Sequence, residues 1–138
     1  MPNFILVRNP TLRQIGQITE LYRMAGWWTR ESDDPELVSA IVAGSRLFMV
    51  AETGDEILAM GRVISDGVCD AYIQDIAVKN GWRGRGIGAG IVERLVARLR
   101  EEGINWIGLV AEQGSVEFYS RLGFEKMANS EPMIFTNG

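Results

Sequence analysis

The sequence predicts a single α/β domain with four helices and a mixed, mostly antiparallel sheet of six to seven strands. At 138 residues the chain has the usual size of one domain, and no repeat, low-complexity tract or linker divides residues 1–138. The composition is that of an ordinary globular protein, with 46% hydrophobic and 23% charged residues. Helical and strand-like apolar spacings follow one another in the order β-α-α-β-β-β-α-β-α-β-β, which is typical of the α/β class.

The first part of the chain is expected to form one strand and two helices. Residues 3–8 have the composition of a short strand. Asn9-Pro10-Thr11 then offers a helix start, and that helix is expected to stop near Gly26. The second helix is expected to start in the cap region Ser32-Asp33-Asp34-Pro35 and to end at Gly44.

A three-strand meander is expected next. The strands cover residues 46–52, 56–65 and 68–78, and turn signals at Thr53-Gly54-Asp55 and Asp66-Gly67 separate them. Such short connections join neighbouring antiparallel strands, so this part of the sheet should be antiparallel.

The remaining elements include the one expected β-α-β crossover. A helix over residues 86–102 leads into a buried strand at 104–111, and a short helix follows at 115–122. A final hairpin is expected from residues 123–128 and 131–136.

Two residue counts exclude several classes of catalytic site. Histidine is absent from the chain and Cys69 is its only cysteine. Zinc sites of the His/Cys type, Cys/His nucleophilic pairs, Ser/His/Asp triads and internal disulfides are therefore excluded.

The charge and hydropathy patterns limit the expected partners. The formal net charge of −4 argues against a nucleic-acid surface and is compatible with a cationic small substrate. The first residues lack a basic segment followed by a long apolar run, and no stretch approaches eighteen apolar residues. We therefore expect a cytoplasmic protein that binds neither nucleic acid nor a membrane.

A cluster of glycines and arginines lies directly before the helix expected at 86–102. Gly84, Gly86 and Gly88 remove side chains where a strand turns into a helix, so backbone N–H groups can approach an anion closely. Arg83 and Arg85 add the charge that phosphates attract, and two arginines suggest more than one phosphate. The alternative is a tight connection with two solvated arginines.

Known phosphate-binding loops match this cluster unequally. A Walker-type loop is excluded, because it requires Gly-Lys-Ser/Thr where this chain has Gly86-Ile87-Gly88. Gly84-x-Gly86-x-x-Ala89 satisfies the dinucleotide fingerprint, but the candidate ribose-binding acid, Glu112, lies 28 residues after Gly84 rather than about 20. The preceding strand also belongs to an antiparallel meander, and no second β-α-β unit follows.

Three motifs at matching spacing resemble the GNAT-type N-acetyltransferases. RGRGIG (83–88) resembles the family's acetyl-CoA pyrophosphate loop, DIAV (75–78) its pantetheine-pairing strand, and FYSRLGF (118–124) its late tyrosine motif. The element order also matches, so the resemblance covers essentially the whole chain. Further stretches are most similar to the small bacterial and plastid-type amine acetyltransferases: AGWW, RVISDG and YIQDIAV.

The resemblance implies acetyl-CoA as co-substrate, without a metal. The central strand would offer backbone groups to pantetheine, with an N–H near Ile76 polarising the thioester carbonyl. The family often has asparagine at the position of Glu112, and a glutamate cannot donate the same hydrogen bond. The implied cofactor-binding residues are Ile76, Ala77, Val78, Arg83, Gly84, Arg85, Gly86, Ile87, Gly88, Ala89, Glu112, Phe118 and Tyr119.

The resemblance also implies that Tyr119 protonates the departing thiolate, although packing beside Phe118 is its structural alternative. The resemblance leaves open which group accepts the amine's proton. Tyr72 occupies the position where several family members carry a glutamate. Asp75 is the candidate carboxylate, but strict strand alternation turns it away from Tyr72, Gln74 and Ile76.

The acceptor site is expected in the loop between the first two helices and at the strand ends. Its residues are Trp27, Trp28 and Glu31 in the loop, with Tyr72 and Gln74 on the strand. The expected partner is a small primary amine, and the chain is expected to be a monomer or a homodimer. The alternative function is an acyl-CoA-binding sensor or partner domain without turnover.

Overall fold

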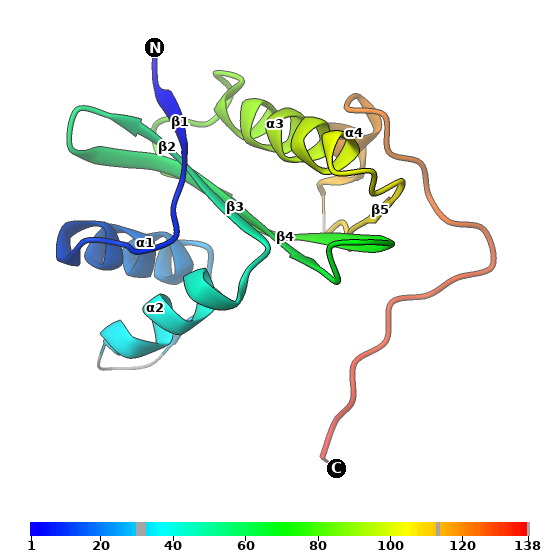
Figure 1. Cartoon of the computed structure of the whole chain (residues 1–138), viewed down its shortest axis with the longest axis horizontal. Helices are drawn as coiled ribbons and strands as arrows, with labels where there is room; N and C mark the ends of the chain where they lie inside the picture. Colours follow the sequence, from blue (N-terminus) through cyan, green and yellow to red (C-terminus); the bar gives the residue numbers. More distant parts are fainter. Residues whose placement is uncertain (30–32, 113, 138) are drawn as a thin grey trace.

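The computed structural model describes residues 1–29, 33–112 and 114–137. A five-stranded sheet in the order β1-β2-β3-β4-β5 lies between two layers of helices (Figure 1). The strands are β1 (Asn3–Leu6), β2 (Leu47–Thr53), β3 (Glu56–Ser65), β4 (Asp70–Val78) and β5 (Trp106–Gly108). The helices are α1 (Leu12–Met24), α2 (Pro35–Gly44), α3 (Ile87–Glu101) and α4 (Val116–Ser120).

The first two helices begin at side-chain caps, as the sequence predicts. Thr11 Oγ1 accepts a hydrogen bond from Gln14 N at 3.1 Å, and Gln14 Oε1 accepts one from Thr11 N at 2.9 Å, which completes a capping box for α1. Asp34 caps α2 by accepting from Leu37 N at 3.1 Å, and Pro35 occupies the first helical turn.

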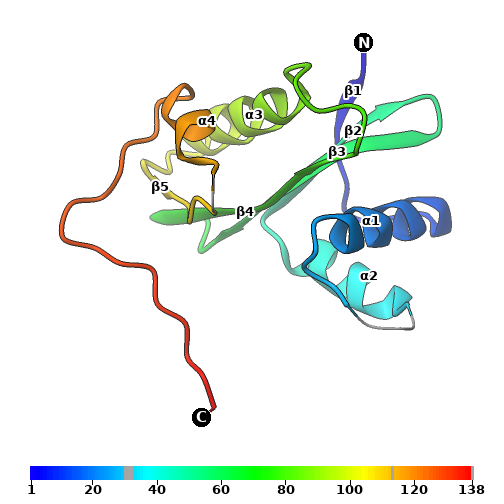
Figure 2. The same ribbon diagram turned by 180° about the vertical axis from the view of Figure 1, so that it is seen from behind.

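The helices cover opposite faces of the sheet, and strand alternation supplies both cores. On β2, Phe48 and Val50 pack with α1 and α2, whereas Met49 and Ala51 pack with α3. The view from behind shows α1 and α2 on one side of the sheet, and α3 and α4 on the other (Figure 2). Within the described chain, no helix is long and apolar enough to cross a membrane.

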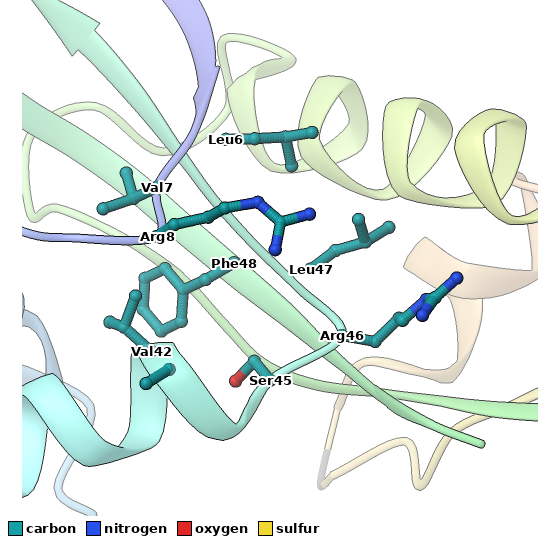
Figure 3. Close-up of a pocket in the computed structure, with 9 residues that line it drawn as sticks. Leu6, Val7, Arg8, Val42, Ser45, Arg46, Leu47 and Phe48 are labelled. Atoms are coloured by element: carbon teal, nitrogen blue, oxygen red, sulfur yellow. The ribbon is translucent and has the colours of Figure 1, made fainter. Parts of the chain in front are cut away.

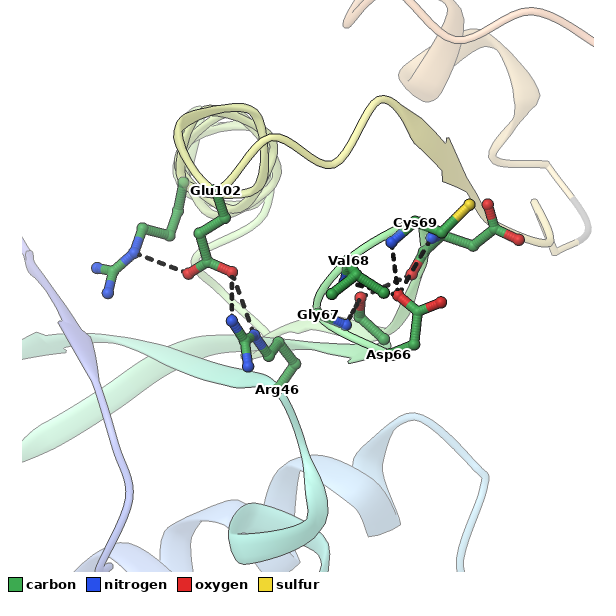
Figure 4. Close-up of polar contacts among 9 residues, drawn as sticks. Arg46, Asp66, Gly67, Val68, Cys69 and Glu102 are labelled. Carbon is green, nitrogen blue, oxygen red and sulfur yellow. Dashed lines mark hydrogen bonds and ion pairs between the residues drawn. The ribbon is translucent and has the colours of Figure 1, made fainter.

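The turn between β3 and β4 explains why β4 begins at Asp70 rather than at residue 68. The Asp66 carboxylate accepts hydrogen bonds from Val68 N at 2.8 Å and Cys69 N at 2.7 Å, so these residues belong to the turn (Figure 4). Beside this turn, Glu102 at the end of α3 pairs with Arg46 at 3.1 Å, which ties the helix end to the start of β2.

The expected sheet of six to seven strands is wrong, because the described residues form a sheet of five strands. The expected strand at 104–111 is shortened to Trp106–Gly108, and the hairpin of 123–128 with 131–136 is absent from the described residues. A tight two-residue hairpin turn favours Asn-Gly, with positive φ at both positions. Asn129 has φ 54°, but Ser130 follows it, so the turn redirects the chain without reversing it.

Candidate functional site

A bulge in β4 lies at the centre of the candidate site. The register with β3 shifts between Met60 and Arg62, so Asp75 and Ile76 together oppose Gly61. Asp75 has φ 59°, a left-handed conformation that Asp adopts more readily than most residues. A Cβ on Gly61 would lie 2.7 Å from Ile91 Cγ2, so only glycine lets the bulged strand and α3 meet there.

The bulge overturns the expectation that Asp75 faces away from Gln74. Arg62 contacts both side chains, with Nε 2.6 Å from Asp75 Oδ2 and Nη2 3.4 Å from Gln74 Oε1. Tyr22 of α1 donates its hydroxyl to the same Asp75 oxygen at 2.7 Å. Burial, followed by this hydrogen bond, raises the pKa of Tyr22 far above its usual value. Asp75 is therefore bound by two partners, on the face of the sheet that α1 covers.

Beyond the bulge, the edge of β4 that faces β5 is open, in that no strand of the described residues pairs with it. Parallel pairing with β5 ends at Tyr72 and Gly108, while β4 continues to Val78 along β3. Lys79 N donates to Leu58 O of β3 at 2.7 Å. Strand alternation therefore turns the N–H and C=O groups of Val78 and Ile76 away from β3, toward the open edge.

The open edge leads into the glycine loop and the N-terminus of α3. Gly84 and Gly86 have φ of 79° and 80°, which side-chain-bearing residues rarely adopt. Gly86 is the N-cap of α3 and makes no side-chain cap hydrogen bond. The first helical bond runs from Gly90 N to Gly86 O at 2.9 Å, so the N–H groups of residues 87–89 lack helical acceptors.

The two arginines of the glycine loop make different contacts. Arg83 Nε donates to Val78 O at 3.4 Å, and the guanidinium of Arg85 lies 4.7 Å from the ring centroid of Trp82. Both side chains remain exposed. The expected grouping of positive charge at the start of α3 is therefore present in the structure.

Tyr119 of α4 lies in an aromatic cluster against the core on the α3 side. Its ring makes edge contacts with Phe118 at 4.9 Å and with Phe124 at 5.9 Å, measured between centroids. Burial, with the negative charge of Glu112 as the second cause, raises the pKa of Tyr119 to about 12. The hydroxyl is therefore protonated throughout the neutral range.

The loop after α1 reaches the segment that follows β5. Trp27 Nε1 donates to Glu112 Oε2 at 3.3 Å, so the same carboxylate that acts on Tyr119 also binds the loop. Trp28 stacks on Tyr22 with a centroid distance of 4.2 Å. Glu31 lies outside the described residues.

Of the expected acceptor residues on β4, Tyr72 is exposed and its ring lies 5.2 Å from that of Trp106 on β5. Gln74 is also exposed, next to Arg62. Tyr72, Gln74 and Asp75 therefore lie on the same face of β4. Tyr72 and Gln74 are exposed there, whereas Asp75 is bound to Arg62 and Tyr22.

Two surface hollows lie away from these residues. The larger, of about 210 Å³, lies where β1, β2 and the end of α2 meet, and Arg8 extends across it (Figure 3). The smaller, of about 160 Å³, lies beside α1. Neither is lined by a residue that the sequence predicts for the site. Among the described residues, no three His, Cys, Asp or Glu side chains lie together so that they could hold a metal ion.

Sequence reasoning missed the residues that hold Asp75. Arg62 and Tyr22 come from β3 and α1, and nothing in their local sequence connects them to residue 75. Gly61 did offer a signal, because a glycine inside an apolar strand often marks a bulge or a close backbone approach.

Comparison with known proteins relates this geometry to one family. Residues 13–124 match the family model described as "Acetyltransferase (GNAT) family". The chain is 31% identical over 124 residues to "Serotonin N-acetyltransferase 2, chloroplastic" of Oryza sativa subsp. japonica, which is 88% of this chain and 61% of that protein. The chain therefore spans less than two thirds of this relative's length.

Solved structures share the fold. A Staphylococcus aureus protein of unknown function, described as a probable acetyltransferase, has a TM-score of 0.82 at 22% identity, covering 99% of each chain. A predicted acetyltransferase with acetyl-CoA from Clostridium acetobutylicum has a TM-score of 0.73 at 18% identity, covering 97% of this chain and 96% of that one. With the family model spanning most of the sequence, the chain belongs to the GNAT acetyltransferase family.

Proposed function

We propose that the protein is an acetyl-CoA-dependent N-acetyltransferase that acts on a small primary amine. The observation that carries the proposal is the continuous backbone surface from the open edge of β4 to the uncapped start of α3. The membership in the GNAT family and the structural neighbour described with acetyl-CoA support the same co-substrate.

The residues present fit acetyl-CoA. Backbone groups of residues 76–78 would pair with the pantetheine arm, since two of these residues turn their polar groups to the open edge. The N–H groups of residues 87–89 would receive the pyrophosphate, helped by the helix dipole. Arg83 and Arg85 would supply positive charge there.

Acetyl-CoA supplies a thioester, which a neutral amine can attack directly. The Ile76 N–H, directed away from β3 beside the bulge, would stabilise negative charge on the carbonyl oxygen. Tyr119 would give its proton to the departing sulfur, since its raised pKa keeps the hydroxyl protonated in the neutral range. Phe118 would pack beside it.

The acceptor site would be formed by Trp27, Trp28 and Glu31 from the loop after α1, with Tyr72 and Gln74 from β4. Asp75 has Arg62 and Tyr22 as partners, which favours a positioning role over that of a free base. We therefore propose that ordered water at Tyr72 and Gln74 takes the amine's proton, or that the amine binds in its neutral form. Glu112 would border both the pantetheine arm and this site, through its contact with Trp27.

Thiol release with an amine panel tests the proposal. The thiol reagent DTNB also reacts with exposed Cys69, so the assay uses Cys69→Ser, which makes the protein itself silent. We expect thiol release that requires both acetyl-CoA and an amine, and a melting shift with CoA but much less with NAD. A melting shift with NAD and none with CoA would contradict the proposal. A shift with CoA but no turnover across the panel would instead indicate an acyl-CoA-binding domain.

A further inference from the structure

The hollow of about 210 Å³ lies between two connections of the chain, one that leaves β1 and one that enters β2 (Figure 3). Val7 N donates to Phe48 O at 2.8 Å, and from Arg8 onwards the chain leads away from the sheet to α1. On the other side, α2 ends at Gly44 and two residues connect it to β2. None of the residues that we propose for acetyl transfer lines this space.

The walls of the hollow are mostly apolar. Val42 and Phe48 are buried members of the core on the α1 and α2 side, and Leu47 is a buried member of the core on the α3 side. Ala43 also lines the hollow but is exposed, so it lies at the rim. Ligand sites typically combine such apolar walls with a few polar groups, and those for drug-sized molecules have volumes of roughly 300–1,000 Å³. The smaller volume here restricts the occupant to a small molecule.

Arg8 supplies a positive charge to this apolar space. Its side chain extends across the hollow (Figure 3), and no hydrogen bond or ion pair within the described chain engages its guanidinium. Arg46, the other arginine of the lining, differs because its guanidinium pairs with Glu102 at 3.1 Å. A guanidinium carries N–H donors in a planar fork that fits a carboxylate. Arg8 therefore offers an unused anion-binding group beside apolar walls.

The end of α2 restricts the charge of the occupant. Carbonyl groups at a helix C-terminus carry partial negative charge and disfavour anions. Ser45 reduces this effect, because its Oγ donates to Ile41 O at 2.6 Å and its N–H donates to Val42 O at 3.3 Å. With one unpaired guanidinium and a helix end nearby, the hollow suits a monoanion better than a multiply charged phosphate.

We propose that this hollow binds a small aliphatic monocarboxylate with a short branched chain. The carboxylate pairs with the Arg8 guanidinium, and the branched chain lies against Val42 and Phe48. A compact branched chain suits the small volume better than a long linear one. The site goes beyond the proposed acetyl transfer and does not rest on it.

Titration with isovalerate, followed by amide NMR spectra, tests the site. We expect saturable shifts of the amides of residues 6–8 and 42–48. The expected Kd is about 1 mM, which a ligand of about seven non-hydrogen atoms reaches at ordinary ligand efficiency. Isovaleramide has the same shape without the charge, and acetate has the charge without the branched chain. Each should bind at least about 10-fold more weakly than isovalerate.

Two variants at exposed positions separate the charge from the space. Arg8→Gln removes the charge and should raise the Kd for isovalerate by at least about 10-fold. Ala43→Trp keeps the charge but fills the hollow from its rim, so it should abolish binding. Arg121→Gln is the matched control, because it removes an exposed positive charge on the distant side of the sheet, where Arg121 pairs with Glu117. It should leave the Kd unchanged.

Four results would overturn the proposal. Shifts that do not saturate would mean that Arg8 is only solvated. Shifts confined to the amides of residues 87–89 would place the carboxylate at the start of α3 instead. Equal binding of isovaleramide or acetate would remove one of the two recognition elements. An unchanged Kd in Arg8→Gln or in Ala43→Trp would place the ligand outside the hollow. None of these measurements depends on acetyl transfer.

Discussion

The two halves of the candidate site are formed by different kinds of chemical group. The proposed cofactor half consists mainly of backbone groups in one continuous stretch, from Asp75 in the bulge to Ala89 in the first turn of α3. The proposed acceptor half consists of side chains from distant segments, such as Trp27 after α1, Tyr72 on β4 and Glu112 after β5. Binding by the first half should therefore depend on glycines, and specificity on long-range packing.

The largest expected effect tests the backbone half. Gly86→Val should abolish stabilisation by acetyl-CoA and CoA, since a β-branched side chain is strained at φ 80° and obstructs the approach of a phosphate. For the unmodified chain, ligand at a hundredfold excess over Kd adds about 2.7 kcal/mol, which a thermal melt detects.

The matched control for that variant is Gly54→Val, in the turn between β2 and β3. Gly54 also has a positive φ, of 60°, so the substitution introduces similar backbone strain away from the loop. Both variants should melt at lower temperature, but only Gly86→Val should lose the CoA shift. Unchanged CoA affinity in Gly86→Val would mean that the cofactor binds elsewhere.

The second effect separates packing from proton transfer at Tyr119. Tyr119→Phe keeps the ring that contacts Phe118 and Phe124, so CoA affinity should be unchanged. Turnover should fall by about 10²-fold, the low end for loss of a general acid, because a thiolate is already a tolerable leaving group. Wild-type turnover in this variant would leave Tyr119 with a structural role alone.

The same division explains what the sequence could predict. The start of α1, the cap of α2 and the glycine loop depend on neighbouring residues, so local patterns located them. The facing of Asp75 depends on a bulge, which moves every later side chain of β4 to the other face. The final hairpin of 123–128 with 131–136 is a sequence expectation that the described residues do not form, and Asn129 with its positive φ is followed by Ser130 rather than by the glycine that a tight hairpin turn favours.

A smaller effect tests the role of Asp75. Asp75→Asn keeps a residue type that tolerates the left-handed conformation but removes the charge that pairs with Arg62. The free energy of unfolding should fall by about 1–3 kcal/mol in chemical denaturation, because a half-buried guanidinium loses its charged partner. Turnover should stay close to that of the unmodified chain.

Asp70→Asn is the control, because Asp70 lies on the same strand and is exposed. This variant should change neither the free energy of unfolding nor turnover. The opposite result for Asp75→Asn would be a loss of about 10²–10⁴ in turnover with CoA binding intact. That outcome would make Asp75 the base and would remove water at Tyr72 and Gln74 from the mechanism.

The smallest effect concerns the residue that joins the two halves. If the amine binds in its neutral form, kcat/KM should rise with pH toward the amine's own pKa, about 9–10.5 for alkylamines. Tyr119 loses its proton only near its raised pKa of about 12, so the unmodified chain should show no decline in kcat/KM over the same pH range.

Glu112→Gln removes the negative charge that is the second cause of this shift, while burial, the larger cause, remains. The pKa should therefore fall only part of the way to its usual value, and the decline in kcat/KM should begin at lower pH. Glu117→Gln, exposed on α4 and paired with Arg121, is the control and should leave the profile unchanged. If kcat/KM depends on pH in the same way in Glu112→Gln and in Glu117→Gln, then Glu112 does not act on Tyr119 during turnover. The two halves of the site would then be electrostatically independent.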